Sequence, residues 1–503
     1  MGVGGIALLG CAEPGFVLER APQGSTSVSV PQTSGGAGSS GTTTEASQTG
    51  TTSVPMPACD ADGSCPVKID LLFVIDNSGT MGEEQLTLAR NFGELVDELQ
   101  TLTDGSANDA PADVHIMVTT TDMGNPRCDD EFKPPGYEEQ RGAPVATPCT
   151  ERIERFTGRG VDAPTIEAAC LEVCDPAAPA APTSHFIAFG PEGSNVEGGT
   201  PTDALACIGP QGIDGCGFES PLEAMLQALN PCACWNDPAA CGEDAVAACV
   251  QTPYEQSFLR EGAILAIVMI TDEADCSVRD FSMMTASTFM ETSPLTGLPE
   301  PSSAQCWNAG VVCPAEPDGT LSGCTPSNWS IDGSSGVSDE DAVLHPTSRY
   351  EALLGSFRAE GREVVMLGVL GVPEVTAYDD APPFLPVQGG VADLQYRGWA
   401  DPAYPAGDIL PEDWDAGADA ASKTFEFGIG PGCTVVTEDY AGQGIPPVRI
   451  RRVCESLDTP DDPKTAFDES AVRCCMESVC GDDFTPALRC LTELIRTAIV
   501  PVG

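Results

Sequence analysis

The chain has 503 residues, 76 of them acidic and 23 basic, and a formal net charge of −53. Nucleic acids bind basic patches that neutralise phosphates, so this charge argues against a nucleic-acid partner, and anionic membranes would repel the chain as well. Yet 41% of the residues are hydrophobic, which is too many for a disordered acidic polymer. The three histidines, His115, His185 and His345, argue against histidine-rich zinc sites.

The first segment, residues 1–11, is a short apolar run that ends in Leu8-Leu9-Gly10-Cys11. It resembles the lipobox of bacterial lipoproteins, which implies cleavage before Cys11 and a lipid on that cysteine. No Lys or Arg precedes the apolar run, unlike a usual secretory signal, and a start upstream of Met1 would account for this. The alternative is a chance Leu-Gly-Cys in an N-terminus without lipid.

Residues 12–57 form the next segment, which consists mostly of Ser, Thr and Gly from Pro22 onward, with Glu45 as the only charged residue after that point. Such a composition buries too little apolar surface to offset the entropy of ordering, so we expect a flexible tether. The folded part is then residues 58–503.

The 23 cysteines are the second compositional signal. If Cys11 carries lipid, an even number remains, and a chain with so many thiols suits an oxidising compartment where they form disulfides. The longest apolar run, Ala263–Ile270, is far shorter than the ~20 residues of a membrane-spanning helix. We therefore expect an exported protein of the bacterial cell envelope, an outer-membrane lipoprotein or cell-surface protein, which contacts the membrane only through Cys11.

Apolar runs typical of buried parallel strands recur along the folded part, with helical patterns between them. The expected strands are 68–76, 113–119, 185–189, 263–271 and 363–370. The expected helices are 82–102, 220–229 and 483–499. This alternation predicts an α/β fold with a doubly wound, mostly parallel sheet.

Four cysteine-bearing or Gly- and Pro-rich stretches are too long to be ordinary connections. They lie at about 123–184, 230–256, 277–341 and 372–446. We interpret them as insertions in one domain, held by disulfides because none has a core of its own.

The first expected strand ends in Asp76-Asn77-Ser78-Gly79-Thr80, directly before a helix. Asp76, Ser78 and Thr80 alternate, so one loop offers a carboxylate and two hydroxyls to a common point. The fourth strand of this set ends at Asp272, and parallel strands bring their carboxyl ends to one edge. Oxygen ligands suit Mg²⁺ or Ca²⁺ better than zinc or copper, so we expect a hard-cation site here.

The pattern Asp76-x-Ser78-x-Thr80 after a hydrophobic strand, with Asp272 ending a later strand, resembles the metal-ion-dependent adhesion site of von Willebrand factor A (vWA) domains. The resemblance implies a further ligand on a loop before a helix, where the family has Thr. This chain has Glu219 at that place, with Ser220 as the second choice. The extra carboxylate would favour Ca²⁺ and leave less positive charge for an acidic ligand. The resemblance also implies that 473–480 and 483–499 are the last strand and the last helix of the domain, and it extends to cysteine-rich, lipid-anchored bacterial proteins of this family.

Other interpretations of these motifs are weaker. Asp76 resembles the Asp-Thr-Gly loop of aspartic proteases, but Asn77 interrupts that pattern and a second copy is missing. Cys232-Ala233-Cys234 lacks zinc-site spacing, and Cys59–Cys65 suits a bridged turn better than a calcium loop. The competing role for Asp76, Ser78 and Asp272 is helix capping and loop hydrogen bonding without a metal.

The sequence therefore favours a surface-tethered, cation-dependent binding or adhesion module rather than an enzyme, with a protein or glycan as its partner. One alternative is a metal-dependent hydrolase in which Glu219, Glu273 or Asp275 acts as the base. Another is a structural envelope protein whose metal only stiffens loops.

Overall fold

The structure is a computed structural model. It describes residues 66–103, 111–128, 137–158, 166–230, 233, 235, 258–314, 320–399, 420–436, 441–460 and 471–499. Cys11, the expected tether 12–57, the Cys59–Cys65 turn and most of the stretch 230–256 lie outside the described residues.

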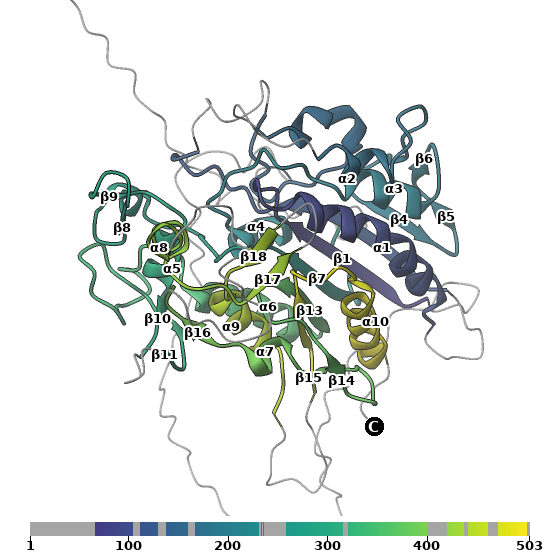
Figure 1. The fold of residues 1–503 in the computed structure, drawn as a ribbon. Helices are drawn as coiled ribbons and strands as arrows, with labels where there is room; N and C mark the ends of the chain where they lie inside the picture. Colours follow the sequence, from purple (N-terminus) through teal and green to yellow (C-terminus); the bar gives the residue numbers. More distant parts are fainter. Residues whose placement is uncertain are drawn as a thin grey trace, which may run out of the picture.

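A mostly parallel seven-stranded sheet forms the centre of the molecule (Figure 1). Its strands, in spatial order, are β19 (Cys474–Ser478), β13 (Val364–Leu370), β7 (Ile264–Ile270), β1 (Lys68–Ile75), β2 (Asp113–Thr120), β4 (Ile187–Gly190) and β5 (Gly193–Ser194). The pairs from β19 to β2 are parallel, whereas β4 runs antiparallel to β2. The first strand thus lies in the middle, with later strands added on both sides, as in a doubly wound fold. The predicted fold class is confirmed.

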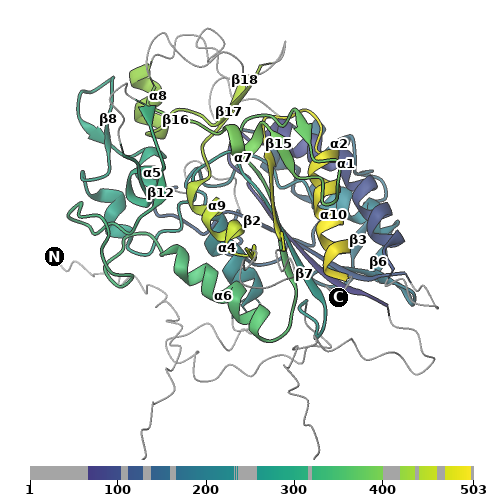
Figure 2. The ribbon, with the colours of Figure 1, turned by 90° about the horizontal axis from the view of Figure 1, so that it is seen from below.

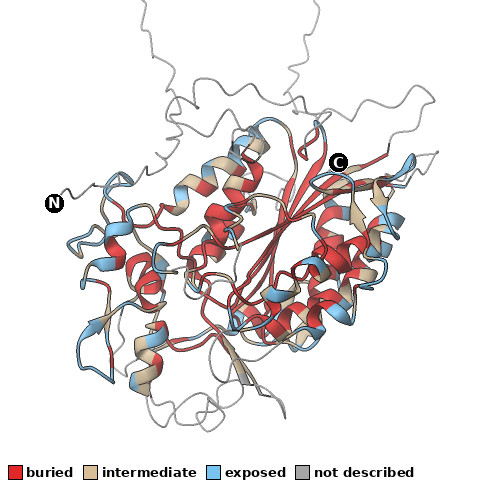
Figure 3. Ribbon diagram, turned by 90° about the horizontal axis from the view of Figure 1, so that it is seen from above, coloured by how far each residue is buried: buried red, intermediate tan, exposed pale blue. Residues whose placement is uncertain are grey.

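Helices cover both faces of the sheet (Figure 2). One layer consists of α1 (Gly82–Thr101), α2 (Ala168–Leu171), α3 (Pro201–Ile208) and α10 (Thr485–Ile499). The other consists of α4 (Pro221–Leu229), α6 (Thr347–Ala359) and α9 (Val448–Glu455). The strands are buried between the two layers (Figure 3), which explains their nearly continuous apolar sequence.

The two faces of β1 show how the layers share the core. Ile69, Leu71 and Phe73 belong to the cluster under α1 and α10, whereas Leu72 and Val74 belong to the cluster under α4, α6 and α9. This alternation follows from the two-residue period of a strand.

The remaining short elements lie in the long connections. They are β3 (Ala181–Pro182), β6 (Val196–Glu197), β8 (Glu291–Thr292), β9 (Pro299–Glu300), β10 (Val311–Val312), β11 (Thr320–Leu321), β12 (Thr325–Pro326), β14 (Ala377–Tyr378), β15 (Pro386–Gln388), β16 (Tyr396–Arg397), β17 (Cys433–Val436), β18 (Ala441–Gly444), η1 (Cys149–Phe156), η5 (Phe281–Thr285), α5 (Ala304–Gly310), α7 (Gly390–Asp393) and α8 (Ala420–Phe427).

The expectation that the insertions lack cores is wrong for 277–341. This stretch forms its own buried cluster, in which Met283, Met284 and Phe289 pack near Leu344. A second cluster joins this stretch to the last one, since Trp307 and Trp399 belong to the same group of buried side chains. The reason is that these connections are long enough to fold back and bury large side chains against each other.

All sixteen cysteines of the described residues are paired. The bridges are Cys128–Cys216, Cys149–Cys170, Cys174–Cys207, Cys276–Cys306, Cys313–Cys324, Cys433–Cys480, Cys454–Cys474 and Cys475–Cys490. So many disulfides indicate an oxidising, extracytoplasmic compartment. Among the described helices, none combines the length and the apolar character needed to cross a membrane.

Candidate metal centre

Asp76 follows β1 at the carboxyl edge of the sheet and is fully buried. Its Oδ2 accepts a hydrogen bond of 2.5 Å from the Thr271 hydroxyl, and its Oδ1 accepts one of 2.8 Å from the Ser78 amide. The Thr121 hydroxyl lies 3.5 Å from the same Oδ1. Donors from the ends of three adjacent strands therefore fix the carboxylate.

The hydroxyls of the same loop lie together, because Ser78 Oγ and Thr80 Oγ1 are 3.4 Å apart. Neither caps the following helix: α1 has Met81 at its N-cap position and no side-chain hydrogen bond there. The alternative that this loop caps the helix therefore does not hold for α1. The Asp76–Ser78 contact is loop hydrogen bonding, as that alternative foresaw.

Asp272 and Glu273 follow β7, which is paired with β1. The Asp272 side chain is 5% exposed, and its Oδ1 has no hydrogen-bond partner among the described residues. The backbone is held in place on both sides: Ile445 N donates to Asp272 O at 2.6 Å, and Glu273 N donates to the Thr271 hydroxyl at 3.1 Å.

Glu219 reaches the same place from the loop between α3 and α4. It is 1% exposed, and its Oε1 also lacks a hydrogen-bond partner in the part of the chain that the structure describes. Its carbonyl accepts from Cys276 N, and the next residue donates its amide to Thr121 O. The hydroxyl of Ser220, the second choice for a ligand, instead donates to Cys276 O at 2.6 Å.

These acids act on each other electrostatically. Burial raises the pKa of Asp76 from 3.8 to about 6, while the Thr271 hydroxyl acts in the opposite direction. Burial, followed by the charges of Asp76 and Glu273, raises the pKa of Glu219 well above its ordinary range. The pKa values of Asp272 and Glu273 are raised by burial first and then by neighbouring acids, Asp76 among them. We name Asp76, Glu219, Asp272 and Glu273 the acid cluster.

No ion pair within the described part of the chain joins the acid cluster to a Lys or Arg side chain. Buried charges in proteins are normally paired or bind metal, because an isolated buried carboxylate is very costly. As the described residues stand, no three His, Cys, Asp or Glu side chains form a ready-made metal cage. A cation here would rely on hydroxyls as well, and the two orphaned carboxylate oxygens of Glu219 and Asp272 suit a hard cation.

Gln85 on α1 braces the loops that carry the acids. Its Nε2 donates to Asp76 O and Gly212 O, both at 2.8 Å, and its Oε1 accepts from the amides of Gln211 and Gly212. The side chain is 1% exposed, so these four bonds satisfy the buried amide completely. One glutamine thus ties the loop after β1 to the loop that leads to Glu219.

Asp275, one of the bases considered for a hydrolase, has another role. Its Oδ2 accepts from Arg449 Nε at 2.9 Å, and its Oδ1 accepts from Ser277 Oγ and from Leu222 N, at the start of α4. It is therefore a buried structural carboxylate that satisfies the first turn of α4.

Three contributors to the site were not among its predicted members. Thr121 and Thr271 contact Asp76 because they follow β2 and β7, the two neighbours of β1. Glu273 was considered only as a base. Each threonine directly follows an apolar strand, and this was the signal in the sequence that could have identified it. Whether its hydroxyl reaches Asp76 depends on which strands are neighbours in the sheet.

A comparison with known protein families, curated proteins and solved structures finds no match for this chain. The seven-stranded mixed, mostly parallel sheet is consistent with a Rossmann-like or vWA-like α/β fold.

Proposed function

We propose that the acid cluster, together with Ser78 and Thr80, holds one divalent cation, Mg²⁺ or Ca²⁺. We further propose that the protein is a cation-dependent binding module of vWA type for a protein or glycan. The observation that carries this is the pair of unpartnered, buried carboxylate oxygens, Glu219 Oε1 and Asp272 Oδ1, beside a third buried acid, Asp76.

Electrostatics favours the acid cluster with a bound cation over the same cluster without one. Without one, each acid must ionise in a buried site, and this burial is the main reason why the pKa values of Asp76, Glu219 and Asp272 are raised; for Glu219 and Asp272, neighbouring acids raise them further. A divalent cation reverses that repulsion and gives the orphaned oxygens a partner. Since the ligands come from loops after β1 and β7 and before α4, binding would also stiffen the edge of the sheet where ligands of such folds bind.

A cation at this edge also suggests how a partner binds. A partly coordinated metal attracts carboxylates and hydroxyls of a ligand and fixes their geometry. Glu219 adds negative charge, which favours Ca²⁺ and a neutral, hydroxyl-bearing ligand group over an acidic one. With the sequence's lipobox-like start and its expected tether, the proposal places this module at the surface of a bacterial envelope.

Thermal melting of the full chain in Mg²⁺, Ca²⁺ and EDTA tests the cation site. We expect either cation to raise Tm above the EDTA value, and Asp76→Ala to abolish this difference. Glu197→Gln, an exposed substitution on β6, is the matched control and should keep the full response. An unchanged chelator response in Asp76→Ala would refute the site.

A second experiment separates binding from a purely structural role. The tagged full chain is used to capture partners from envelope extracts with Ca²⁺ and with EDTA. We expect capture that EDTA and Asp76→Ala both abolish. If the cation raises Tm but the chain captures the same partners in EDTA as in Ca²⁺, the cation only stiffens the loops and does not take part in binding.

A further inference from the structure

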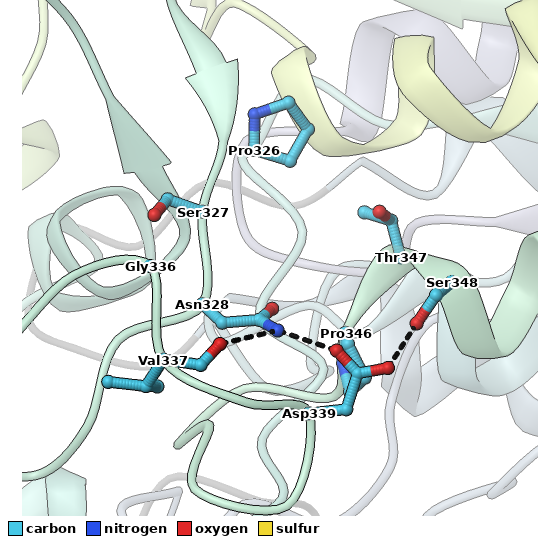
Figure 4. Close-up of a pocket in the computed structure, with 9 residues that line it drawn as sticks. All are labelled: Pro326, Ser327, Asn328, Gly336, Val337, Asp339, Pro346, Thr347 and Ser348. Carbon is cyan, nitrogen blue, oxygen red and sulfur yellow. Dashed lines mark hydrogen bonds between the residues drawn. The ribbon is translucent and has the colours of Figure 1, made fainter.

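A small polar cavity, wide open to solvent, lies between the 277–341 insertion and the start of α6 (Figure 4). Its volume is about 280 Å³, near the lower end of ligand pockets, which span ~300–1,000 Å³. Its lining consists of Pro326, Ser327, Asn328, Gly336, Val337, Asp339, Pro346, Thr347 and Ser348.

The cavity occupies the same edge of the sheet as the acid cluster. The strand β13 begins at Val364, beside Leu265 of β7, and α6 precedes it, so the first turn of α6 lies toward the carboxyl ends of the strands. Arg349 in that turn binds Glu223 of α4 at 3.0 Å, and α4 begins two residues after Glu219. Both features thus flank one face of the molecule.

A hydrogen-bond network links three residues of the lining, of which Asp339 and Ser348 are exposed. Asn328 Nδ2 donates to Asp339 Oδ1 at 2.7 Å, and Ser348 Oγ donates to Asp339 Oδ2 at 2.7 Å. The Asn328 amide oxygen and the Thr347 hydroxyl have no protein partner in the described ranges. Figure 4 shows the Asn328 amide in the middle of the lining, between Asp339 and Pro326, with Thr347 across from it.

This lining selects among ligand classes. No Lys or Arg lines the cavity and one carboxylate does, so an anion is disfavoured. A cation finds a single carboxylate whose two oxygens already accept hydrogen bonds. A neutral group with several hydroxyls fits this lining, because it can use the free Asn328 amide oxygen and the Thr347 hydroxyl together. The rings of Pro326 and Pro346 and the Val337 side chain offer apolar contacts for C–H groups.

We propose that this cavity binds one neutral sugar residue, either a free monosaccharide or a unit of a glycan. Its hydroxyls bond to Asn328 and Thr347, and its C–H face lies against the proline rings. The inference goes beyond the cation site and does not depend on it, because none of these lining residues belongs to the acid cluster.

Saturation-transfer difference NMR on the full chain in EDTA tests the proposal. The probes are glucose, galactose, mannose and N-acetylglucosamine, each as free sugar and as methyl glycoside. We expect transfer to at least one of them, and signals from the glycoside indicate a chain-linked unit whereas signals confined to the free sugar indicate a monosaccharide. Because the experiment is done in EDTA, a failure of the cation site does not affect it.

Variants locate the binding. Thr347→Val removes the hydroxyl with little change in shape, and Asn328→Leu removes the amide; each should weaken binding about tenfold or more. Ser356→Ala, farther along α6, is the control and should bind as the wild type does. Melting curves verify that each variant is folded, and Thr347→Val remains the decisive one if Asn328→Leu is unstable. Absence of transfer to every probe, or transfer that Thr347→Val leaves unchanged, would overturn the proposal.

Discussion

The acid cluster makes an unusual prediction about pH: in EDTA, the protein should lose stability as the pH rises from about 4 to about 7. A carboxyl group whose pKa is raised in the folded state binds its proton more tightly there than in the unfolded state. It therefore contributes stability that is present below its unfolded pKa and is lost as the pH rises through its folded pKa.

The size of the effect follows from Asp76. Moving its pKa from 3.8 to about 6 makes its ionisation cost about 3 kcal/mol in the folded chain. Glu219, Asp272 and Glu273 have raised pKa values as well and act in the same direction. A divalent cation at a hundred times its Kd returns about 3 kcal/mol, so Ca²⁺ at that concentration should offset a loss as large as the share of Asp76.

Urea unfolding at pH 5.0 and 7.5, with EDTA or with Ca²⁺, measures this. The net charge of −53 also opposes folding at high pH, so the comparison uses Glu219→Gln, which removes one member of the cluster and keeps its shape. In EDTA this variant should lose less stability between the two pH values than the wild type. The exposed control Glu197→Gln should behave as the wild type does. Equal losses in wild type and Glu219→Gln would refute the reasoning.

Further predictions concern the supports of the site and the covalent framework. Gln85→Leu should cost about 2–4 kcal/mol in urea unfolding, because it removes four buried hydrogen bonds, and should weaken cation affinity in a titration; unchanged affinity would mean that Gln85 is not a brace. Arg449→Met should cost about 3–5 kcal/mol, since it leaves the Asp275 charge buried without its partner, yet the Tm response to Ca²⁺ should persist; loss of that response would link Asp275 to the site. Peptide mapping without reduction should link Cys474 to Cys454 and Cys475 to Cys490, and the opposite pairing would contradict the positions of α9 and α10.

The sheet was predictable because its strands are buried on both faces and read as apolar runs. The expected strand 68–76 is β1, whereas 473–480, which was expected only from the vWA resemblance, is β19 and pairs with β13. The helices α6 and α9 were not predicted individually. Only Tyr350 and Leu354 of α6 are buried, so its apolar pattern is faint. The helix α9 is short and begins just after the expected insertion 372–446. The residues before it have no helical periodicity that would have predicted it.

The candidate site divides in the same way. Asp76 and Asp272 were predictable because each follows an apolar strand, and parallel strands share one carboxyl edge. The contacts of Asp76 with Thr121 and Thr271 were not, because they depend on the register in which Ile75 lies beside Thr120 and Ile270. That register is a property of the folded sheet, and a single strand does not specify its neighbours.

Isothermal titration of Ca²⁺ and Mg²⁺ into the chelated full chain tests the central claim most directly. The account predicts one saturable site per chain, lost in Asp272→Asn and retained in Glu197→Gln. Weak binding without saturation that both variants share would instead reflect the acidic surface, and it would contradict the proposal that Asp76, Glu219 and Asp272 form a cation site.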